Sequence, residues 1–109
     1  MLNKVFLLGT IGDKGVSVRF LEESGTRCAS FLLKLTESGT DGRTFTSYHL
    51  VECFGKALEV AETLEAGDPV LLDGKLRRRK VGADRYETGV LALGLSKVAL
   101  PALGEVSHV

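Results

Sequence analysis

The sequence predicts an all-β domain, a five-stranded Greek-key barrel that carries one short helix between its third and fourth strands. Three observations favour this architecture. The chain has 13 glycines and only two prolines, and short intervals separate its apolar runs, which is typical of a strand-rich domain. Within most runs, apolar residues alternate with polar ones. A single segment has helical spacing, and it follows the third run.

Length and composition describe one domain without an overall charge. The 109 residues suffice for one hydrophobic core and are too few for two, and 44% of them are apolar. Fourteen basic residues balance 14 acidic ones, so attraction to a nucleic acid requires local clustering of charge. No apolar run approaches the roughly 18 residues of a membrane span, and residues 1–4 lead into a strand pattern. We therefore expect a cytoplasmic protein with two reduced, buried cysteines, Cys28 and Cys53.

Alternation of apolar residues places the strands, and glycine-containing loops separate them. Turn signals occur at Ser24-Gly25, at Asp41-Gly42 and at residues 82–84. The predicted strands cover residues 5–8, continued after a bend at 16–20, and then 28–36, 44–54, 70–80 and 85–98.

The helical segment lies between the third and fourth of these strands. From Ala57 to Ala66, apolar residues recur at helical spacing, glutamates occupy the other side, and Gly67 follows as a C-terminal cap. This order is that of a five-stranded Greek-key OB barrel, whereas an all-β sandwich leaves the helix unexplained. We expect an OB-fold domain over residues 1–98 and a flexible C-terminal segment over residues 99–109.

The sequence contains no recognisable catalytic or metal-binding arrangement. Nucleophile-elbow, metalloprotease, P-loop and dinucleotide motifs do not occur. His49 and Cys53 are the nearest candidate pair, but four strand residues separate them by about 13 Å, too far for a nucleophile and its base. Two histidines and two cysteines without a C-x-x-C pair are too few for a zinc site. We expect a protein that is no enzyme and needs no cofactor, with His49 as a packed or interfacial residue.

The strongest local signal is the basic segment over residues 75–80, which reads KLRRRK. Cations on one face of a strand repeat about every 6.6 Å, close to the spacing of successive phosphates in an extended single strand. A basic strand can also protect a sheet edge from unwanted pairing. We interpret the segment as a track for a phosphate backbone. Strand alternation sends Lys75, Arg77 and Arg79 to one face, and Leu72 and Leu76 to the other, toward the core.

The third strand carries two aromatic residues on one of its faces. Tyr48 and Phe54 share the even-numbered face with Leu50 and Glu52, and His49 shares the other face with two apolar residues. If the aromatic face is exposed, each ring can stack on a base for ~1–3 kcal/mol without selecting which base. If it is buried, both rings belong to the core. Glu52 favours exposure but repels phosphates, so the pattern alone leaves the choice open.

Four motifs follow one another in compatible spacing over residues 2–98: residues 3–9 (NKVFLLG), Tyr48-His49 with Phe54-Gly55-Lys56, residues 73–80 (DGKLRRRK), and Asp84-Arg85-Tyr86. Together they resemble the OB domain of bacterial-type single-stranded-DNA-binding proteins. The resemblance implies sequence-tolerant binding of single-stranded DNA in replication, recombination or repair. It also implies a cytoplasmic, nucleoid-associated homotetramer that can contact replication or repair proteins.

The resemblance further implies roles for individual residues. Tyr48 and Phe54 match stacking positions, and His49 matches a histidine associated with subunit contacts. We expect a tetramer, favoured over a dimer, that assembles through the third-strand face carrying His49. Backbone-holding positions of the family are matched by Lys4, Arg19, Lys56, Arg77, Arg79 and Lys80, and Lys75 completes the expected DNA-binding set.

The chain also departs from the family pattern. It has no tryptophan: Gly39 and Val81 stand where two stacking tryptophans are expected, and Tyr48 replaces a third. Leu50 occupies a position that is often arginine, and the family's acidic C-terminal tail does not occur in this sequence. Together with the zero net charge and Glu52, these departures keep a second interpretation open. It is a protein-interaction module similar to primosomal replication protein B, in which DNA binding is weak or secondary.

Overall fold

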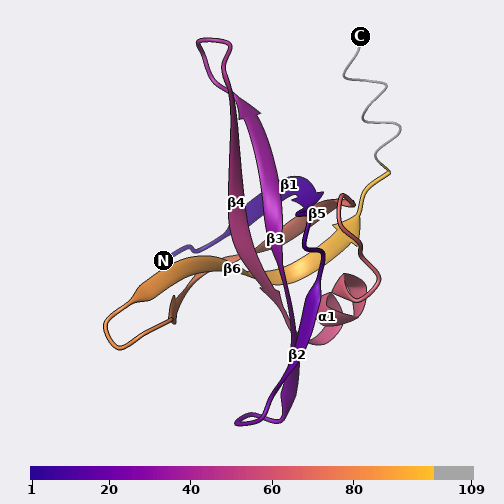
Figure 1. The fold of residues 1–109 in the computed structure, drawn as a ribbon, viewed down its shortest axis with the longest axis vertical. Helices are drawn as coiled ribbons and strands as arrows, with labels where there is room; N and C mark the ends of the chain where they lie inside the picture. Colours follow the sequence, from indigo (N-terminus) through magenta and orange to yellow (C-terminus); the bar gives the residue numbers. More distant parts are fainter. Residues whose placement is uncertain (100–109) are drawn as a thin grey trace.

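The chain forms a closed barrel from which hairpins project (Figure 1). Our computed structural model describes residues 1–99. β1 and β2 are the two halves of the predicted first strand, so the five-stranded barrel with a helix before its fourth strand is confirmed. The elements are β1 (Val5–Ile11), β2 (Ser17–Leu21), β3 (Thr26–Ser38), β4 (Thr44–Cys53), α1 (Gly55–Ala61), β5 (Pro69–Lys80) and β6 (Tyr86–Lys97).

Strand pairing closes the barrel in the order β1-β5-β6-β4-β3, and β3 returns to β1 at Thr10 and Ile11. Most neighbours are antiparallel, whereas β4 and β6 run parallel through Val51↔Val90. Among the described residues, β1 pairs with β5 along residues 5–10 but with β3 only at its last two positions. The other edge of residues 5–8 therefore has no strand paired with it within the described chain.

The barrel interior is filled by alternate residues of the strands. Val51 and Cys53 are both 0% exposed in this core, so the odd-numbered face of β4 points inward and the aromatic face points outward. The sequence pattern leaves open whether the face with Tyr48 and Phe54 is exposed or buried, and the structure shows that it lies outside the barrel. Val51 and Cys53 are thereby removed from any subunit interface, whereas Phe45 and His49 on the same face are exposed, so assembly through that face stays a prediction. Cys28 and Cys53 are buried and unpaired, as expected.

The helix is shorter than its predicted extent, 57–66. α1 ends at Ala61, and the chain then turns: the Thr63 hydroxyl donates to the Val60 carbonyl at 2.7 Å. The N–H of Glu65 donates to an Asp68 carboxylate oxygen at 2.8 Å. These local bonds replace further helical turns. Gly67, with φ of 85°, belongs to the turn into β5, where its N–H donates to the Ile11 carbonyl at 2.8 Å.

Two long hairpins leave the barrel, β3–β4 and β5–β6 (Figure 1). We call residues 75–89 of the second hairpin the arm; it begins beyond a bulge at Asp73/Gly74. The prediction that Leu76 is a core residue is wrong: it is 52% exposed, because the bulge directs this part of β5 away from the barrel. Leu72, before the bulge, is buried as predicted. Apart from Ala99, the expected flexible segment lies outside the described residues.

Candidate nucleic-acid interface

Tyr48 lies on the outer face of β4, opposite Lys34 of β3. Its side chain is 54% exposed, so the ring is available to a flat ligand. A hollow of about 230 Å³ lies beside it, lined by Leu32 of β3 and by residues 12–15 of the loop after β1. Neither Lys34 nor Lys14, which lines this hollow, is among the cations predicted from the sequence. The alternation over residues 28–36 places Lys34 on the outward face, and this is the sequence signal that could have identified it.

Phe54 follows β4 directly and is the N-cap residue of α1. The ring is half-buried, and the guanidinium of Arg77 from the arm lies 5.9 Å from its centroid. This distance is within the range of a cation–π contact. Phe54 thus differs from Tyr48, since a cation from another hairpin already lies over it.

Two further predicted cations lie beside Glu52, a residue of β4 two positions before Phe54. An Oε2 of Glu52 lies 3.4 Å from Nη1 of Arg79 in the arm and 3.7 Å from Nη2 of Arg19 in β2. The Sγ of Cys28 lies 3.9 Å from the same oxygen. The structure therefore brings Arg19, Arg77 and Arg79 to the aromatic face of β4, together with a carboxylate.

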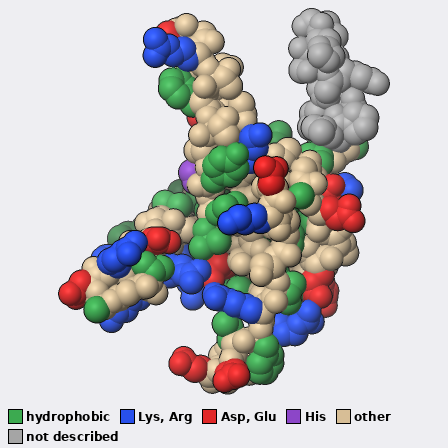
Figure 2. Space-filling view, in the orientation of Figure 1, with side chains coloured by type: hydrophobic (Ala, Val, Ile, Leu, Met, Phe, Trp, Pro, Cys, Tyr) green, Lys and Arg blue, Asp and Glu red, His purple; other side chains and the backbone are tan. Residues whose placement is uncertain are grey.

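The remaining predicted cations are distributed differently. Lys56 is exposed in α1, two residues after Phe54, and Lys75 and Lys80 are exposed in the arm. Lys4 does not join them: its Nζ lies 3.2 Å from a carboxylate oxygen of Asp73 and 5.3 Å from the centroid of Phe6. Lys and Arg side chains follow the projecting arm and continue beside β2 in the space-filling view (Figure 2).

His49 is exposed, and its Nε2 lies 2.9 Å from the Ser47 hydroxyl. The ring therefore contributes nothing to the barrel core, although Val51 and Cys53 on the same side of β4 are fully buried. The reason is that His49 lies where the β3–β4 hairpin leaves the barrel.

The two thiols are not activated as nucleophiles. Burial, and then the Glu52 carboxylate, raises the pKa of Cys28 above its ordinary value of 9.0. Burial raises the pKa of Cys53 to about 12, with smaller contributions from Cys28 and Glu52. Both side chains are therefore protonated near neutral pH, and the nucleophilic thiolate is disfavoured. Within residues 1–99 no cluster of His, Cys, Asp and Glu side chains could hold a metal ion, and no helix could span a membrane.

Solved structures with the same fold include two single-stranded-DNA-binding proteins. A Plasmodium falciparum SSB in complex with ssDNA superimposes with a TM-score of 0.75 at 20% identity, covering 90% of this chain and 96% of the other. The small single-stranded DNA-binding protein from Streptomyces coelicolor gives a TM-score of 0.72 at 20% identity, covering 93% and 97%. Comparison with curated protein sequences finds no match.

The sequence itself matches the pattern of one protein family over nearly the whole barrel. The match extends from residue 2 to residue 96, which includes β1 to β5 and all but the last residue of β6. It agrees with the motif resemblance and with the barrel topology. The chain belongs to the single-strand binding protein family.

Proposed function

We propose that this member of the single-strand binding protein family carries single-stranded DNA across the surface formed by the outer face of β4 and the adjoining arm. One observation supports this path above all others. Arg77 and Arg79 extend from the arm to Phe54 and Glu52, so cations and an aromatic ring from two separate hairpins meet at the same surface. The DNA complex of the Plasmodium falciparum relative supports the ligand class.

In this proposal, rings and cations act on different parts of the strand. Tyr48 and Phe54 each stack on a base for ~1–3 kcal/mol, and any base can take part because each has a flat face. Arg19, Arg77 and Arg79 pair with phosphates, and Lys56 and the arm lysines add positive charge at the two ends. Phosphate pairing releases counterions, so affinity depends on salt. Neither interaction identifies a base, which accounts for sequence tolerance.

Family membership supports a binding role in replication, recombination or repair, and it supports binding in place of catalysis. A nucleoid-associated, cytoplasmic location is the corresponding proposal. Contacts with replication or repair proteins are proposed on the same basis.

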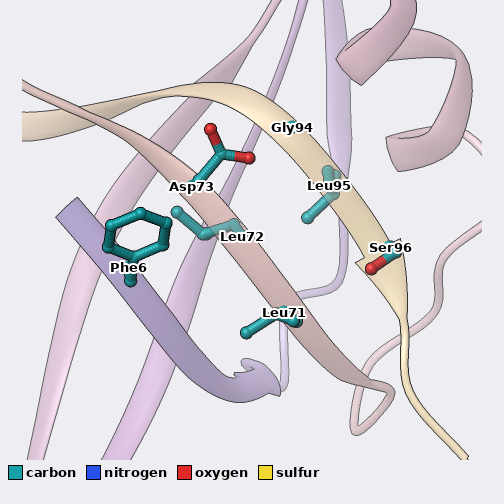
Figure 3. A pocket seen from close by; sticks show the side chains of 7 residues that line it. All are labelled: Phe6, Leu71, Leu72, Asp73, Gly94, Leu95 and Ser96. Carbon is teal, nitrogen blue, oxygen red and sulfur yellow. The ribbon is translucent and has the colours of Figure 1, made fainter. Parts of the chain in front are cut away.

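A second copy of this chain is the proposed occupant of the open edge of β1. The outer faces beside this edge are apolar, with Phe6 71%, Leu8 53% and Leu93 57% exposed. A groove of about 330 Å³ adjoins Phe6; Leu71 from β5 and Leu95 from β6 also line it, together with the polar side chains of Asp73 and Ser96 (Figure 3). Pairing of two β1 edges around a two-fold axis satisfies their backbone groups, and apolar faces of two such dimers then bury one another. The expected assembly is a tetramer, with His49 as a further candidate contact.

Light scattering tests the assembly. The wild-type chain is expected to be a tetramer at micromolar concentration, and Phe6→Glu is expected to dissociate it. Phe20→Glu is the matched control, since Phe20 is 61% exposed on β2, away from the β1 edge. A wild-type monomer contradicts the proposal.

Titration of a labelled oligonucleotide at several salt concentrations tests DNA binding. Arg77→Ala is expected to weaken binding of every sequence alike and to reduce the salt slope by roughly 0.7. Arg27→Ala is the control: it removes the same charge, but Arg27 pairs with Glu62 at 2.7 Å, beside the helix. If the folded wild-type chain binds no oligonucleotide at low salt, the protein-interaction module becomes the better interpretation.

A further inference from the structure

The proposed DNA-binding surface contains one acidic side chain, Glu52, which pairs with two of the arginines that are proposed to bind phosphates. Glu52 lies between Leu50 and Phe54 on β4, with its side chain only 12% exposed. Its contacts come from three other elements: Arg19 from β2, Cys28 from β3 and Arg79 from the arm. The carboxylate is therefore held inside the proposed DNA path.

A carboxylate and a phosphate are competing ligands for a guanidinium, because both offer paired anionic oxygens to the same N–H donors. Arg19 and Arg79 both face the Oε2 atom of Glu52, at 3.7 Å and 3.4 Å. Two positive charges and one negative charge leave this cluster with a net charge of about one, where the two arginines alone would supply two. The cluster therefore attracts phosphates less than its arginines suggest.

The ion pairs are loose enough to be exchanged. Close pairs between a guanidinium and a carboxylate have N–O distances of about 2.7–2.9 Å. The Arg27–Glu62 pair of this chain has that geometry, at 2.7 Å, whereas both Glu52 pairs are longer by at least 0.7 Å. Arg19 is 51% exposed and Arg79 30% exposed, so both guanidinium groups can be reached by an incoming strand.

We propose that Glu52 is an internal counter-charge that occupies Arg19 and Arg79 in the free protein and must yield them to DNA phosphates. The competition lowers both the affinity for single-stranded DNA and its dependence on salt. Because Arg79 belongs to the arm, the same exchange releases a contact between the arm and β4. This inference rests on the proposed DNA-binding function.

The isosteric variant Glu52→Gln tests the competition in oligonucleotide titrations over a range of salt concentrations. It is expected to bind roughly two- to tenfold more tightly at low salt, the effect of removing two weak ion pairs. Its salt slope is expected to steepen by roughly 0.7, since about one more phosphate is neutralised. Glu62→Gln is the control for the change in net charge, because Glu62 pairs with Arg27 beside the helix. Thermal melting verifies that each variant is folded, and Glu52→Ala repeats the test if Glu52→Gln is not.

Double variants show whether the arginines carry the effect. In an Arg19→Ala/Arg79→Ala background, Glu52→Gln is expected to gain less than in the wild type, because only direct repulsion between the carboxylate and the phosphates is then removed. A gain that persists in full there, or a Glu52→Gln variant that binds no better than the wild type, overturns the inference. Its failure differs from that of the proposed function: if DNA binding itself is wrong, neither the wild type nor Arg77→Ala gives any titration signal.

Discussion

The side-chain amide of Asn3 pairs with the backbone of Leu76 in both directions. Its Nδ2 donates to the Leu76 carbonyl, and the Leu76 N–H donates to its Oδ1, each at 2.9 Å. Asn3 precedes β1, so its side chain extends the β1–β5 pairing beyond the last backbone pair, Val5↔Gly74. Leu76 lies just past the bulge at the start of the arm. A residue near the N-terminus therefore fixes the base of a hairpin more than 70 positions away.

Replacing Asn3 with alanine is expected to loosen the base of the arm. The change removes two hydrogen bonds of about 0.5–1.5 kcal/mol each, and the exposed setting favours the lower end of this range. Hydrogen exchange at the Leu76 amide is expected to accelerate, and urea unfolding to show a loss of about 1–2 kcal/mol. Asn3→Asp is the control, since it keeps the acceptor and is expected to keep the Leu76 amide protected. Equal exchange in Asn3→Ala and the wild type contradicts this role.

The two aromatic residues are expected to differ in their effects on stability. Tyr48→Ala and Phe54→Ala each cost ~1–3 kcal/mol of DNA affinity with little change in salt slope, because stacking releases no counterion. Tyr48→Ala leaves the melting temperature nearly unchanged, since the ring is 54% exposed. Phe54→Ala lowers it, because a half-buried ring under Arg77 is removed.

Phe45→Ala is the matched control for both aromatic variants. Phe45 is 57% exposed on β4, but alternation places it on the opposite face from Tyr48. Its removal is expected to leave affinity unchanged. If Tyr48→Ala also leaves affinity unchanged in a folded protein, the DNA path does not follow the outer face of β4.

The barrel order could be predicted from sequence because its signals are local. Alternation over 28–36 and 44–54 marks two strands, and a single helical period between strands is typical of this barrel. The orientation of β4 could not be predicted, because both of its faces carry apolar residues. Only closure of the barrel, with β6 parallel to β4 at Val51, decides which face is inside.

Prediction from the sequence was also limited at the candidate site. Alternation correctly grouped Arg77 with Arg79, since both face the outer surface of β4. It failed for Leu76, because the alternation of apolar and polar residues continues past the bulge at Asp73/Gly74, whereas β5 has left the barrel core there. The pairing of Glu52 with Arg79 joins residues 27 positions apart, and no local pattern carries that information.

The buried thiol of Cys53 is expected to make stability depend on alkaline pH. Its pKa is about 12 in the folded chain, against an ordinary value of 9.0. Well below pH 9 the Cys53 thiol keeps its proton in both the folded and the unfolded chain, so its contribution to the free energy of unfolding is fully present. As the pH rises from 9 toward 12, the unfolded chain loses the proton first, so the free energy of unfolding falls.

Urea unfolding from pH 7 to about 10.5 measures this dependence. Cys53→Ala is expected to be less stable at every pH, because the change leaves a cavity, but to lose less stability as the pH rises. Parallel curves for the two proteins would show that Cys53 does not contribute.

A tryptophan placed at the tip of the arm is expected to add a stacking platform. Val81 is 40% exposed there and stands where the family resemblance expects a tryptophan. Val81→Trp is expected to tighten DNA binding by roughly 1–3 kcal/mol with an unchanged salt slope. The new side chain is also the only tryptophan of the chain, so quenching of its fluorescence by oligonucleotide reports stacking directly.

The corresponding change at Gly39 is expected to gain less, although the resemblance places a tryptophan there too. A Cβ on Gly39 would lie 2.7 Å from the Phe45 ring and 3.1 Å from Asp41 Oδ1, so these two side chains must shift to accept any side chain there. Gly39→Trp is therefore expected to lower the melting temperature, whereas Val81→Trp leaves it nearly unchanged. Val81→Leu is the control for added apolar bulk and is expected to bind as the wild type does. If DNA leaves the fluorescence and affinity of Val81→Trp unchanged, the strand does not reach the tip of the arm, and the path is confined to β4 and the base of the hairpin.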